Sequence, residues 1–427
     1  MDIVELTKQL ITFESTSYNE LPLAQYLVDW LEEKGLPVVL DRFNPTRFLN
    51  DGVNRPDTAN VYATIGNGQQ ALLLYAHMDV VKAPARMFEP RILGERLIGR
   101  GTSDMKSSLA GLMLAAANCR DAIIASQKRV IFAFIADEET SGTGARRHIE
   151  FLTEQKILGN NLWCVLTEPT DGFDNVEIGG KGYIFVDLMG NLEAIITTLQ
   201  SILRSRKELI SRYPSNDGRF GEVIISITTI ACDSEATTER RIIENGISAH
   251  ASRPQEGDNA LEKMLQRISR PIANIQTDQN SPNTIPNRCI AYLAESFPTI
   301  SCRATIDIRT NLSSDQNDGL WTDFQMLLDQ QPMRTHYYVR DRGKAYLTPT
   351  GESGPLNLCL RCRAPQPKVR IALGGSDAGY YALITRNVIG GFGPGEYSQL
   401  HTDAESISLS SLQGASNTFE SLIRSFL

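Results

Sequence analysis

Residues 129–142 have the sequence RVIFAFIADEETSG. The apolar run 130–136 shows no polar alternation, which is typical of a strand buried on both faces in a parallel sheet. Asp137, Glu138 and Glu139 follow it at once. A solvated acidic loop is the usual explanation of such a run, but acids beside a buried strand are costly unless positive charge lies among them. The stretch predicts a central strand that delivers carboxylates to one edge of a sheet.

Strand-like and helical segments alternate around this stretch, which favours an α/β sheet with a parallel core. Strands are expected at 60–65, 71–80 and 162–166, and helices at 4–11, 22–34, 106–120 and 409–426. Between them, successive strands with only a few helices indicate a separate α+β segment. We therefore predict an α/β domain with a mixed, largely parallel sheet between helices, formed by 1–183 and 345–427 and interrupted by an inserted α+β domain at 184–344.

Composition excludes several classes of protein. The 427 residues carry a net charge of -8, which argues against a nucleic-acid partner. No apolar run is expected to reach the roughly 18 residues that span a bilayer, so no membrane partner is expected. The start of the chain, 1–10, reads as an amphipathic helix without signal-peptide features. We expect a cytoplasmic protein whose seven cysteines are reduced, with the Cys359–Cys362 CxxC spacing coincidental.

The strongest chemical signal is LLLYAHMDVV at 72–81, a buried strand that ends in His77 and Asp79. Ligand sites of open α/β sheets lie at this end of the strands. A neutral imidazole is a good zinc ligand when its other nitrogen donates to a carboxylate, and Asp79 points to the same side as His77. A core histidine bonded to its neighbour explains this motif equally well. The two remaining histidines outside every motif, His148 and His336, are expected at the surface or partly buried.

Three further segments contain a potential metal ligand. GRGTSDMK at 99–106 contains Asp104, WCVLTEP ends with Glu168 and Pro169, and His401 precedes the last helix. Asp104 alone is better explained as a helix N-cap. Together, one histidine or carboxylate from each of five loops forms an oxygen and imidazole set that suits zinc, and its size favours two ions with a bridging carboxylate.

The motifs resemble those of the co-catalytic dizinc peptidase and deacylase family, which includes acetylornithine deacetylase, succinyl-diaminopimelate desuccinylase, aminoacylase and glutamate carboxypeptidases. The matching motifs span most of the chain in the family's general order: YAHMDVV, GRGTSDMK, ADEETSG, LTEPT, GGKG, ISAHASRPQEGDNAL, NTIPNRC, DIRT, GGSDAGYY and GPGEYSQLHTDAESI.

The resemblance implies a metal site built from five residues. His77 and Glu168 would bind one zinc, and His401 and Glu139 the other. Asp104 would bridge them, with a cis peptide bond to the next residue. The implied cofactors are two Zn²⁺, with Co²⁺ or Mn²⁺ as alternatives.

It also implies catalytic and substrate-binding residues. The segments 1–183 and 345–427 would form the catalytic domain, and 184–344 would be a lid of the dimerisation type. Glu138 would be the general base on water activated by the zinc ions, and Asp79 would orient His77. His250 of the lid would stabilise the oxyanion. Substrate contacts would come from Arg309, Asn283, Gly375 and Ser376. Arg309 could bind a substrate carboxylate, although pairing with an acid of the lid is the alternative.

One departure concerns the lid. Some sixty residues, 187–247, lie between GGKG and the segment around His250, where ordinary members have few. The rearrangement resembles the enlarged lids of certain dipeptidases, which act as monomers by mimicking a second subunit. A homodimer is expected unless this lid does the same.

We therefore expect a hydrolase that cleaves the amide bond of an N-acyl amino acid, similar to acetylornithine deacetylase, with a small-molecule acyl amino acid or short peptide as its partner. A dipeptidase or carboxypeptidase with the same metal site is the first alternative. A non-catalytic binding protein of the same fold is the second.

Overall fold

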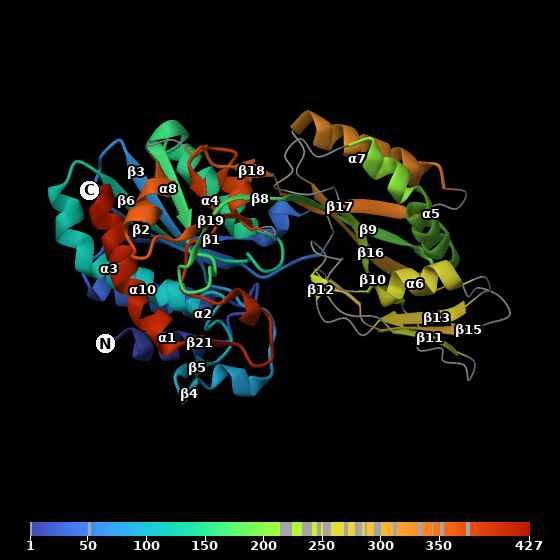
Figure 1. Cartoon of the computed structure of the whole chain (residues 1–427), viewed down its shortest axis with the longest axis horizontal. Coiled ribbons are helices and arrows are strands. Elements are labelled where there is room, and N and C mark those ends of the chain that lie inside the picture. Colours follow the sequence, from blue (N-terminus) through green and yellow to red (C-terminus); the bar gives the residue numbers. More distant parts are fainter. Residues whose placement is uncertain are drawn as a thin grey trace. The chain divides into compact units, whose positions relative to one another are not determined.

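The structure is a computed structural model in which the chain forms two compact units. Unit 1 contains Met1–Gly180 and Tyr346–Leu427, and unit 2 contains Lys181–Ala345 (Figure 1). The structure describes residues 2–49, 53–213, 224–232, 241–245, 249–250, 258–268, 272–277, 284–286, 288–293, 300–310, 314–331, 335–343, 345–350, 354–372 and 376–427.

A six-stranded mixed sheet is the centre of unit 1. Its order is β1-β2-β6-β3-β7-β20, in which β6, β3, β7 and β20 run parallel and β1 and β2 are joined antiparallel. Both β3 and its neighbour β6 are buried along nearly their whole length, as the unbroken apolar runs predict. The strands are β1 (Val38–Phe43), β2 (Thr58–Ile65), β3 (Ala71–His77), β6 (Arg129–Ile135), β7 (Leu162–Leu166) and β20 (Val388–Ile389).

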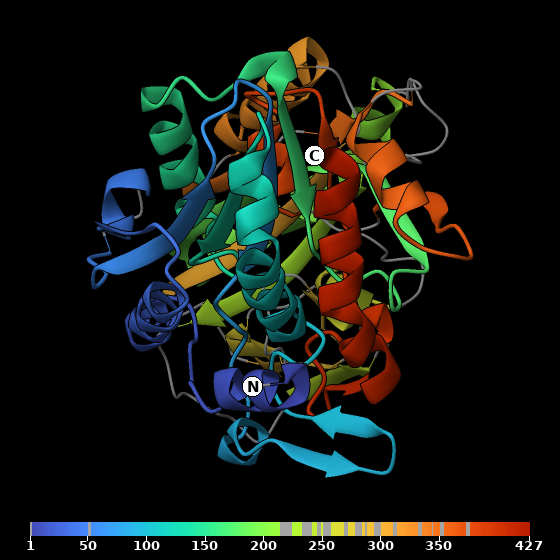
Figure 2. The ribbon, with the colours of Figure 1, turned by 90° about the vertical axis from the view of Figure 1, so that its left-hand side faces the viewer.

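Helices cover this sheet. The first, α1, has Asp2 as its N-cap, and α3 and α10 lie side by side in Figure 2. Their close approach depends on Gly111, because a Cβ there would lie 2.9 Å from the ring of Phe419. The helices are α1 (Ile3–Ile11), α2 (Leu21–Glu33), α3 (Lys106–Ala125), α4 (Thr143–Glu154), α8 (Pro355–Arg361), α9 (Ala378–Tyr381) and α10 (Leu409–Phe426).

Two small sheets complete unit 1. The two consecutive strands β8 and β9 belong to different units, with β8 in unit 1 and β9 in unit 2. A Cβ on Gly180 would lie 2.8 Å from the Tyr346 ring, so the glycine lets β18 pack closely where β8 ends. The sheets are β18-β8-β19, with β18 (Tyr346–Leu347), β8 (Asn175–Gly180) and β19 (Lys368–Ala372), and β21-β5-β4, with β21 (Ser406–Ser408), β5 (Arg96–Ile98) and β4 (Arg91–Leu93).

Unit 2 is built on a four-stranded antiparallel sheet of order β10-β16-β9-β17. Helix α5 contacts β9, β10 and β16, and helices α6 and α7 contact α5. The helices are α5 (Leu192–Ser211), α6 (Ala260–Arg267) and α7 (Ser314–Asp329). The strands of this sheet are β10 (Ile224–Cys232), β16 (Ser301–Thr310), β9 (Gly182–Asn191) and β17 (His336–Gly343).

Further strands of unit 2 form a three-stranded sheet of order β11-β15-β13 and a two-stranded pair of β12 and β14. Sequence periodicity did not predict these strands because they are short and separated by polar segments. They are β11 (Arg241–Asn245), β15 (Arg288–Leu293), β13 (Ile272–Thr277), β12 (Ala249–His250) and β14 (Thr284–Ile285).

The expectation that all cysteines are reduced is wrong for one pair. Cys232 and Cys302 face each other in the register of β10 and β16 and form a disulfide. Their Cα atoms are 4.1 Å apart, because directly opposed positions of an antiparallel pair bring side chains together. The sequence separation of 70 residues hides this pairing. The other five cysteines form no disulfide in the described part of the chain.

Two other expectations need correction. His148 is fully buried, because it stacks on Tyr62 and its Nδ1 lies 2.8 Å from the Tyr381 hydroxyl.

Among the described residues, one helix, α3, is long and apolar enough to cross a membrane. This helix ends at Ala125, past the predicted end at 120, because it continues through the polar pair Arg120–Asp121. More than half of its most apolar stretch is buried, as in the core helices of globular domains.

Candidate metal centre

Three parallel neighbours of the central sheet deliver the site's acids and one histidine to one edge. Strand β3 ends at His77, β6 ends just before the acid loop that we define as 137–142, and β7 ends just before Glu168. Because parallel strands end at the same edge, these loops lie next to each other.

Asp104 lies between two imidazoles. Its Oδ1 is 3.1 Å from His77 Nε2, and its Oδ2 is 3.3 Å from His401 Nε2. Each carboxylate oxygen therefore faces a different histidine, which is the arrangement that a carboxylate bridging two cations requires.

Two further carboxylates join this cluster. Glu139 Oε2 lies 3.0 Å from His401 Nε2, and ligand atoms of His77, Asp104 and Glu139 all lie within 4.8 Å of one another. Glu139 Oε1 and Glu168 Oε1 are buried and have no hydrogen-bond partner. A buried carboxylate oxygen without a donor is costly, so the described protein leaves both oxygens unsatisfied.

The electrostatics of the cluster favour cations. Burial alone would lower the pKa of His77, but the hydrogen bond with Asp104 and the charge of Glu168 raise it well above its usual value. The charge of Glu139 likewise raises the pKa of His401. Burial would raise the pKa of Asp104, yet its two histidine partners hold that pKa well below the ordinary range. Negative charge thus dominates this edge of the sheet.

Glu138 differs from its neighbour. Burial and then the charge of Glu168 raise the pKa of Glu138 well above that of an ordinary glutamate. A raised pKa makes a carboxylate a stronger proton acceptor, which is what a general base requires.

The carboxylate of Asp79 holds the acid loop. Its Oδ1 accepts from the N–H of Glu138 and its Oδ2 from the N–H of Glu139, both at 3.0 Å. The hydrogen bond that orients His77 comes from the main chain of Asp79, since His77 Nδ1 donates to that carbonyl at 2.9 Å, whereas the nearer carboxylate oxygen is 3.7 Å away.

Glu405 holds the loop that carries Asp104. Its carboxylate accepts from the N–H groups of Gly101, Ser103 and Asp104 and pairs with the buried guanidinium of Arg100 at 2.6 Å. The Asp104–Met105 peptide bond is cis, as the resemblance implied. The N-cap of α3 is Met105, so the alternative explanation of Asp104 as a capping residue is wrong.

Comparison with known proteins decides the family, because residues 73–425 match peptidase family M20/M25/M40. The chain belongs to this family. The succinyl-diaminopimelate desuccinylase of Buchnera aphidicola is 31% identical over 198 residues, which cover 44% of this chain and 49% of the relative. The match thus spans about half the length of that curated relative.

Solved M20 structures share the fold over nearly the whole chain. An M20 family metallo-carboxypeptidase from Sulfolobus solfataricus superimposes with a TM-score of 0.64 at 15% identity, covering 99% of both chains. A dinuclear metal-binding peptidase of the M20 family from Bacillus subtilis gives 0.58 at 13% identity, covering 100% of this chain and 97% of the other. The mixed, largely parallel sheet that we predicted is therefore confirmed as an M20 fold.

The side chains of this M20 protein fit a pair of divalent cations. Imidazole nitrogens and carboxylate oxygens are the donors that zinc prefers. Asp104 offers one oxygen to each side, and the unpartnered oxygens of Glu139 and Glu168 lack the positive charge that such ions would supply. The cluster therefore accommodates the dinuclear site that is typical of M20 proteins.

The structure describes only part of the remaining predicted residues. In unit 2, Arg309 is buried and pairs with Asp307 through Nε at 2.7 Å and Nη2 at 2.8 Å, as the alternative expectation held. The backbone of His250 pairs with Thr284 in β12 and β14. In unit 1, Ser376 precedes α9, and its Oγ accepts from the N–H of Ala378 at 3.4 Å. Asn283, Gly375 and the side chain of His250 lie outside what the structure describes.

Sequence reasoning did not single out Ser17, Glu20 or Glu405 as site residues. The polar run 14–20, directly after the amphipathic α1, was one available signal. A second was the position of Glu405, buried four residues after His401. None of these three residues is itself assigned as a metal ligand, so chemistry alone did not point to them.

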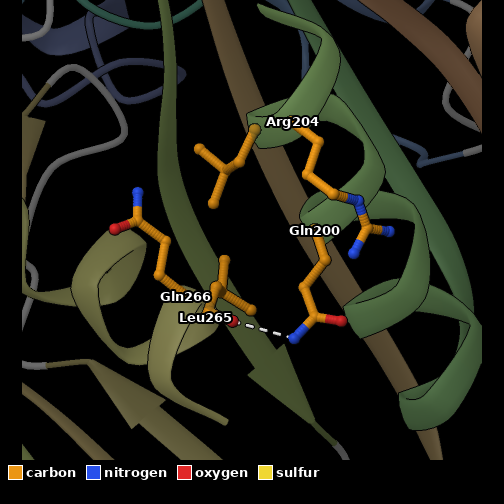
Figure 3. A pocket seen from close by; sticks show the side chains of 5 residues that line it. Gln200, Arg204, Leu265 and Gln266 are labelled. Carbon is orange, nitrogen blue, oxygen red and sulfur yellow. Dashed lines mark hydrogen bonds between the residues drawn. The ribbon is translucent and has the colours of Figure 1, made fainter. Parts of the chain in front are cut away.

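A pocket of about 330 Å³ lies in unit 2 between α5 and α6 (Figure 3). Its lining includes Gln200, whose Nε2 donates to the carbonyl of Leu265 at 2.8 Å, and the exposed Arg204. Among the predicted site residues that the structure describes, none lines this pocket.

Proposed function

We propose that this M20 protein hydrolyses the amide bond of N-acyl amino acids at a site with two divalent cations. The observation that carries the proposal is the pair of contacts made by Asp104, which offers one oxygen to each of two histidines. Glu139 and Glu168 lie in the same cluster, each with a buried oxygen that lacks a partner. Such a set is suited to holding two cations close together.

Each side chain has one role in this proposal. His77, Glu168 and one oxygen of Asp104 would hold one ion; His401, Glu139 and the other oxygen would hold the second. Zinc is the favoured metal, with cobalt or manganese as alternatives. When bound, such ions lower the pKa of water from about 16 towards neutrality and polarise an amide carbonyl.

Glu138 moves the proton. It is adjacent in sequence to Glu139 and is assigned to neither ion, and burial raises its pKa, which makes it a better proton acceptor. It would accept the proton of the attacking water and then donate it to the nitrogen of the leaving amine. Both transfers use the same carboxylate, so its loss removes both.

An N-acyl amino acid is the favoured substrate because the desuccinylase relative is named for removing such an acyl group. The alternative is a dipeptidase or carboxypeptidase, which the additional sheet β11-β15-β13 of unit 2 favours as a sign of a rearranged lid. Arg309 is given no substrate role in either case, because Nε and Nη2 already bind Asp307.

A substrate panel tests the choice. Protein reconstituted with zinc is assayed on acetylornithine, on succinyl-diaminopimelate and on a set of dipeptides. We expect the largest kcat/KM for one of the two acyl amino acids. A larger kcat/KM for a dipeptide than for both acyl compounds would replace the deacylase proposal with the peptidase.

Metal analysis separates an enzyme from a binding protein of the same fold. Folded wild-type protein purified without chelators should contain close to two divalent ions per chain. Folded protein that takes up no ion and cleaves no substrate of the panel would support the non-catalytic alternative.

A further inference from the structure

The segment 15–20, which follows α1, runs along the two loops that carry His77 and the acid pair. Ser15 Oγ donates to the carbonyl of Met78 at 2.8 Å, and Ser17 Oγ donates to Asp79 Oδ2 at 2.7 Å. Farther along, the Tyr18 hydroxyl lies 2.8 Å from Ser141 Oγ. The segment therefore joins the loop after β3 to the acid loop.

The acid loop is held by its backbone. Three consecutive N–H groups, those of Asp137, Glu138 and Glu139, each donate to a buried carboxylate oxygen at 3.0 Å. Asp79 accepts the second and third, and Glu20 accepts the first through Oε1. The start of the loop thus depends on Glu20.

Asp137 needs such support because its φ is +58°, a left-handed conformation that is uncommon for residues other than glycine. Residues held in this region persist when the surrounding structure fixes them. The N–H of Asp137 binds Glu20, and its carboxylate accepts from Thr143. Glu138 is the next residue, so the direction of its side chain follows from this turn.

Glu20 itself is fully buried among neutral donors. Its Oε1 also accepts from the N–H of Tyr18 at 3.0 Å, and its Oε2 accepts from the hydroxyl of Thr58 at 2.6 Å. A buried carboxylate is costly unless hydrogen bonds satisfy it. A glutamate at this buried position is therefore explained by the backbone N–H groups that it binds. One of them belongs to Asp137, the residue directly before Glu138.

We propose that Glu20 is a positioning residue for the hydrolytic reaction, in that it fixes the turn at Asp137 and thereby aims the carboxylate of Glu138. The inference rests on the proposed function of Glu138 as the general base. Glu20 would not touch substrate or metal. Its loss should therefore affect proton transfer and leave substrate binding and metal content nearly intact.

The first test compares Glu20→Ala with Glu20→Gln in metal-reconstituted full-length protein. We expect Glu20→Ala to lower kcat roughly 10- to 100-fold, because small misplacements of a catalytic group have effects of this size, with KM within about twofold. The amide oxygen of Glu20→Gln still accepts the Asp137 N–H, so kcat should return to within about threefold of wild type.

Thr58→Val is the matched control. It removes a hydrogen bond to the same carboxylate but leaves the Asp137 contact, so its kcat should stay close to that of wild type. If Glu20→Ala does not fold, Glu20→Asp replaces it, because the shorter side chain draws the carboxylate away from Asp137. The same loss of kcat is expected.

A second measurement is independent of activity. Hydrogen–deuterium exchange of the peptide around 136–140 should be faster in Glu20→Ala than in wild type and Glu20→Gln. Wild-type exchange and kcat in Glu20→Ala would overturn the inference, as would loss of bound metal in that variant or failure of Glu20→Gln to restore kcat. A wild-type protein that cleaves no amide substrate would instead defeat the proposed function, while exchange would still report on the contact.

Discussion

The carboxylate cluster of unit 1 and the Arg309 pair of unit 2 are both buried and charged, but they are satisfied differently. Arg309 and Asp307 lie two residues apart on β16 and neutralise each other through two hydrogen bonds. In unit 1, by contrast, Glu139 and Glu168 retain buried oxygens without partners. A self-neutralised pair is satisfied within the fold, whereas the unpartnered oxygens of the cluster suit added cations.

Removing the bridge is the strongest way to break this contrast. Asp104→Ala takes away the oxygen that each histidine faces, so it should reduce bound metal below one ion per chain and amide hydrolysis to the level of the assay blank. Metal analysis and the substrate assay check both. A variant that keeps two ions per chain would show that Asp104 does not bridge.

Glu138→Gln should separate the base from the ligands. It removes the proton acceptor but no assigned metal ligand, so kcat should fall by about 10²–10⁴-fold while two ions stay bound. Metal content and kcat are measured on the same preparation. Activity equal to wild type would refute Glu138 as the base.

Substitutions in the Arg309–Asp307 pair should instead lower the stability of the protein and leave its metal content unchanged. Arg309→Met leaves Asp307 buried without its partner, which typically destabilises a protein by about 3–5 kcal/mol. The double variant Arg309→Met/Asp307→Leu removes the uncompensated charge and should recover much of that stability. Urea unfolding measures both, and metal content should remain at two ions. Metal loss in the single variant would contradict the contrast between the two regions.

The smallest predicted effect is on the pH dependence of stability, and it comes from His148, a buried imidazole that stays neutral. Burial lowers the pKa of His148 to about 3, well below the roughly 6.5 of an unfolded histidine. Between these values the unfolded chain binds more protons, so the stability that this group contributes is lost as pH falls below about 6.5.

The matched variant is His148→Asn, which has no titrating group. Between pH 7 and 5.5, wild type should lose roughly 1 kcal/mol more stability than this variant, as measured by urea unfolding at both pH values. Equal losses in the two proteins would show that His148 does not account for the acid sensitivity.

Much of unit 1 could be predicted because its signals are local. Apolar runs such as 130–136 identified the central strands, and the polar residues that follow them identified the edge where the acids and histidines gather. The ends of β7 and α10 were predicted to the residue. Parallel topology then made neighbours of loops distant in sequence.

The supporting contacts could not be predicted in the same way. Glu20 and Glu405 act on backbone N–H groups, whose positions depend on the folded turns and leave no pattern in the sequence. The Cys232–Cys302 disulfide depends on the register of two strands, and the pairing of Arg309 with Asp307 on the rotamers within one strand. Such features follow from tertiary structure.

The most direct test of the account is anomalous diffraction at the zinc absorption edge on crystals of the zinc-loaded protein. We predict two peaks, one at about 2.0–2.1 Å from a nitrogen of His77 and one at the same distance from a nitrogen of His401, with an oxygen of Asp104 beside each. A single peak, or peaks away from Asp104, would contradict the dinuclear centre.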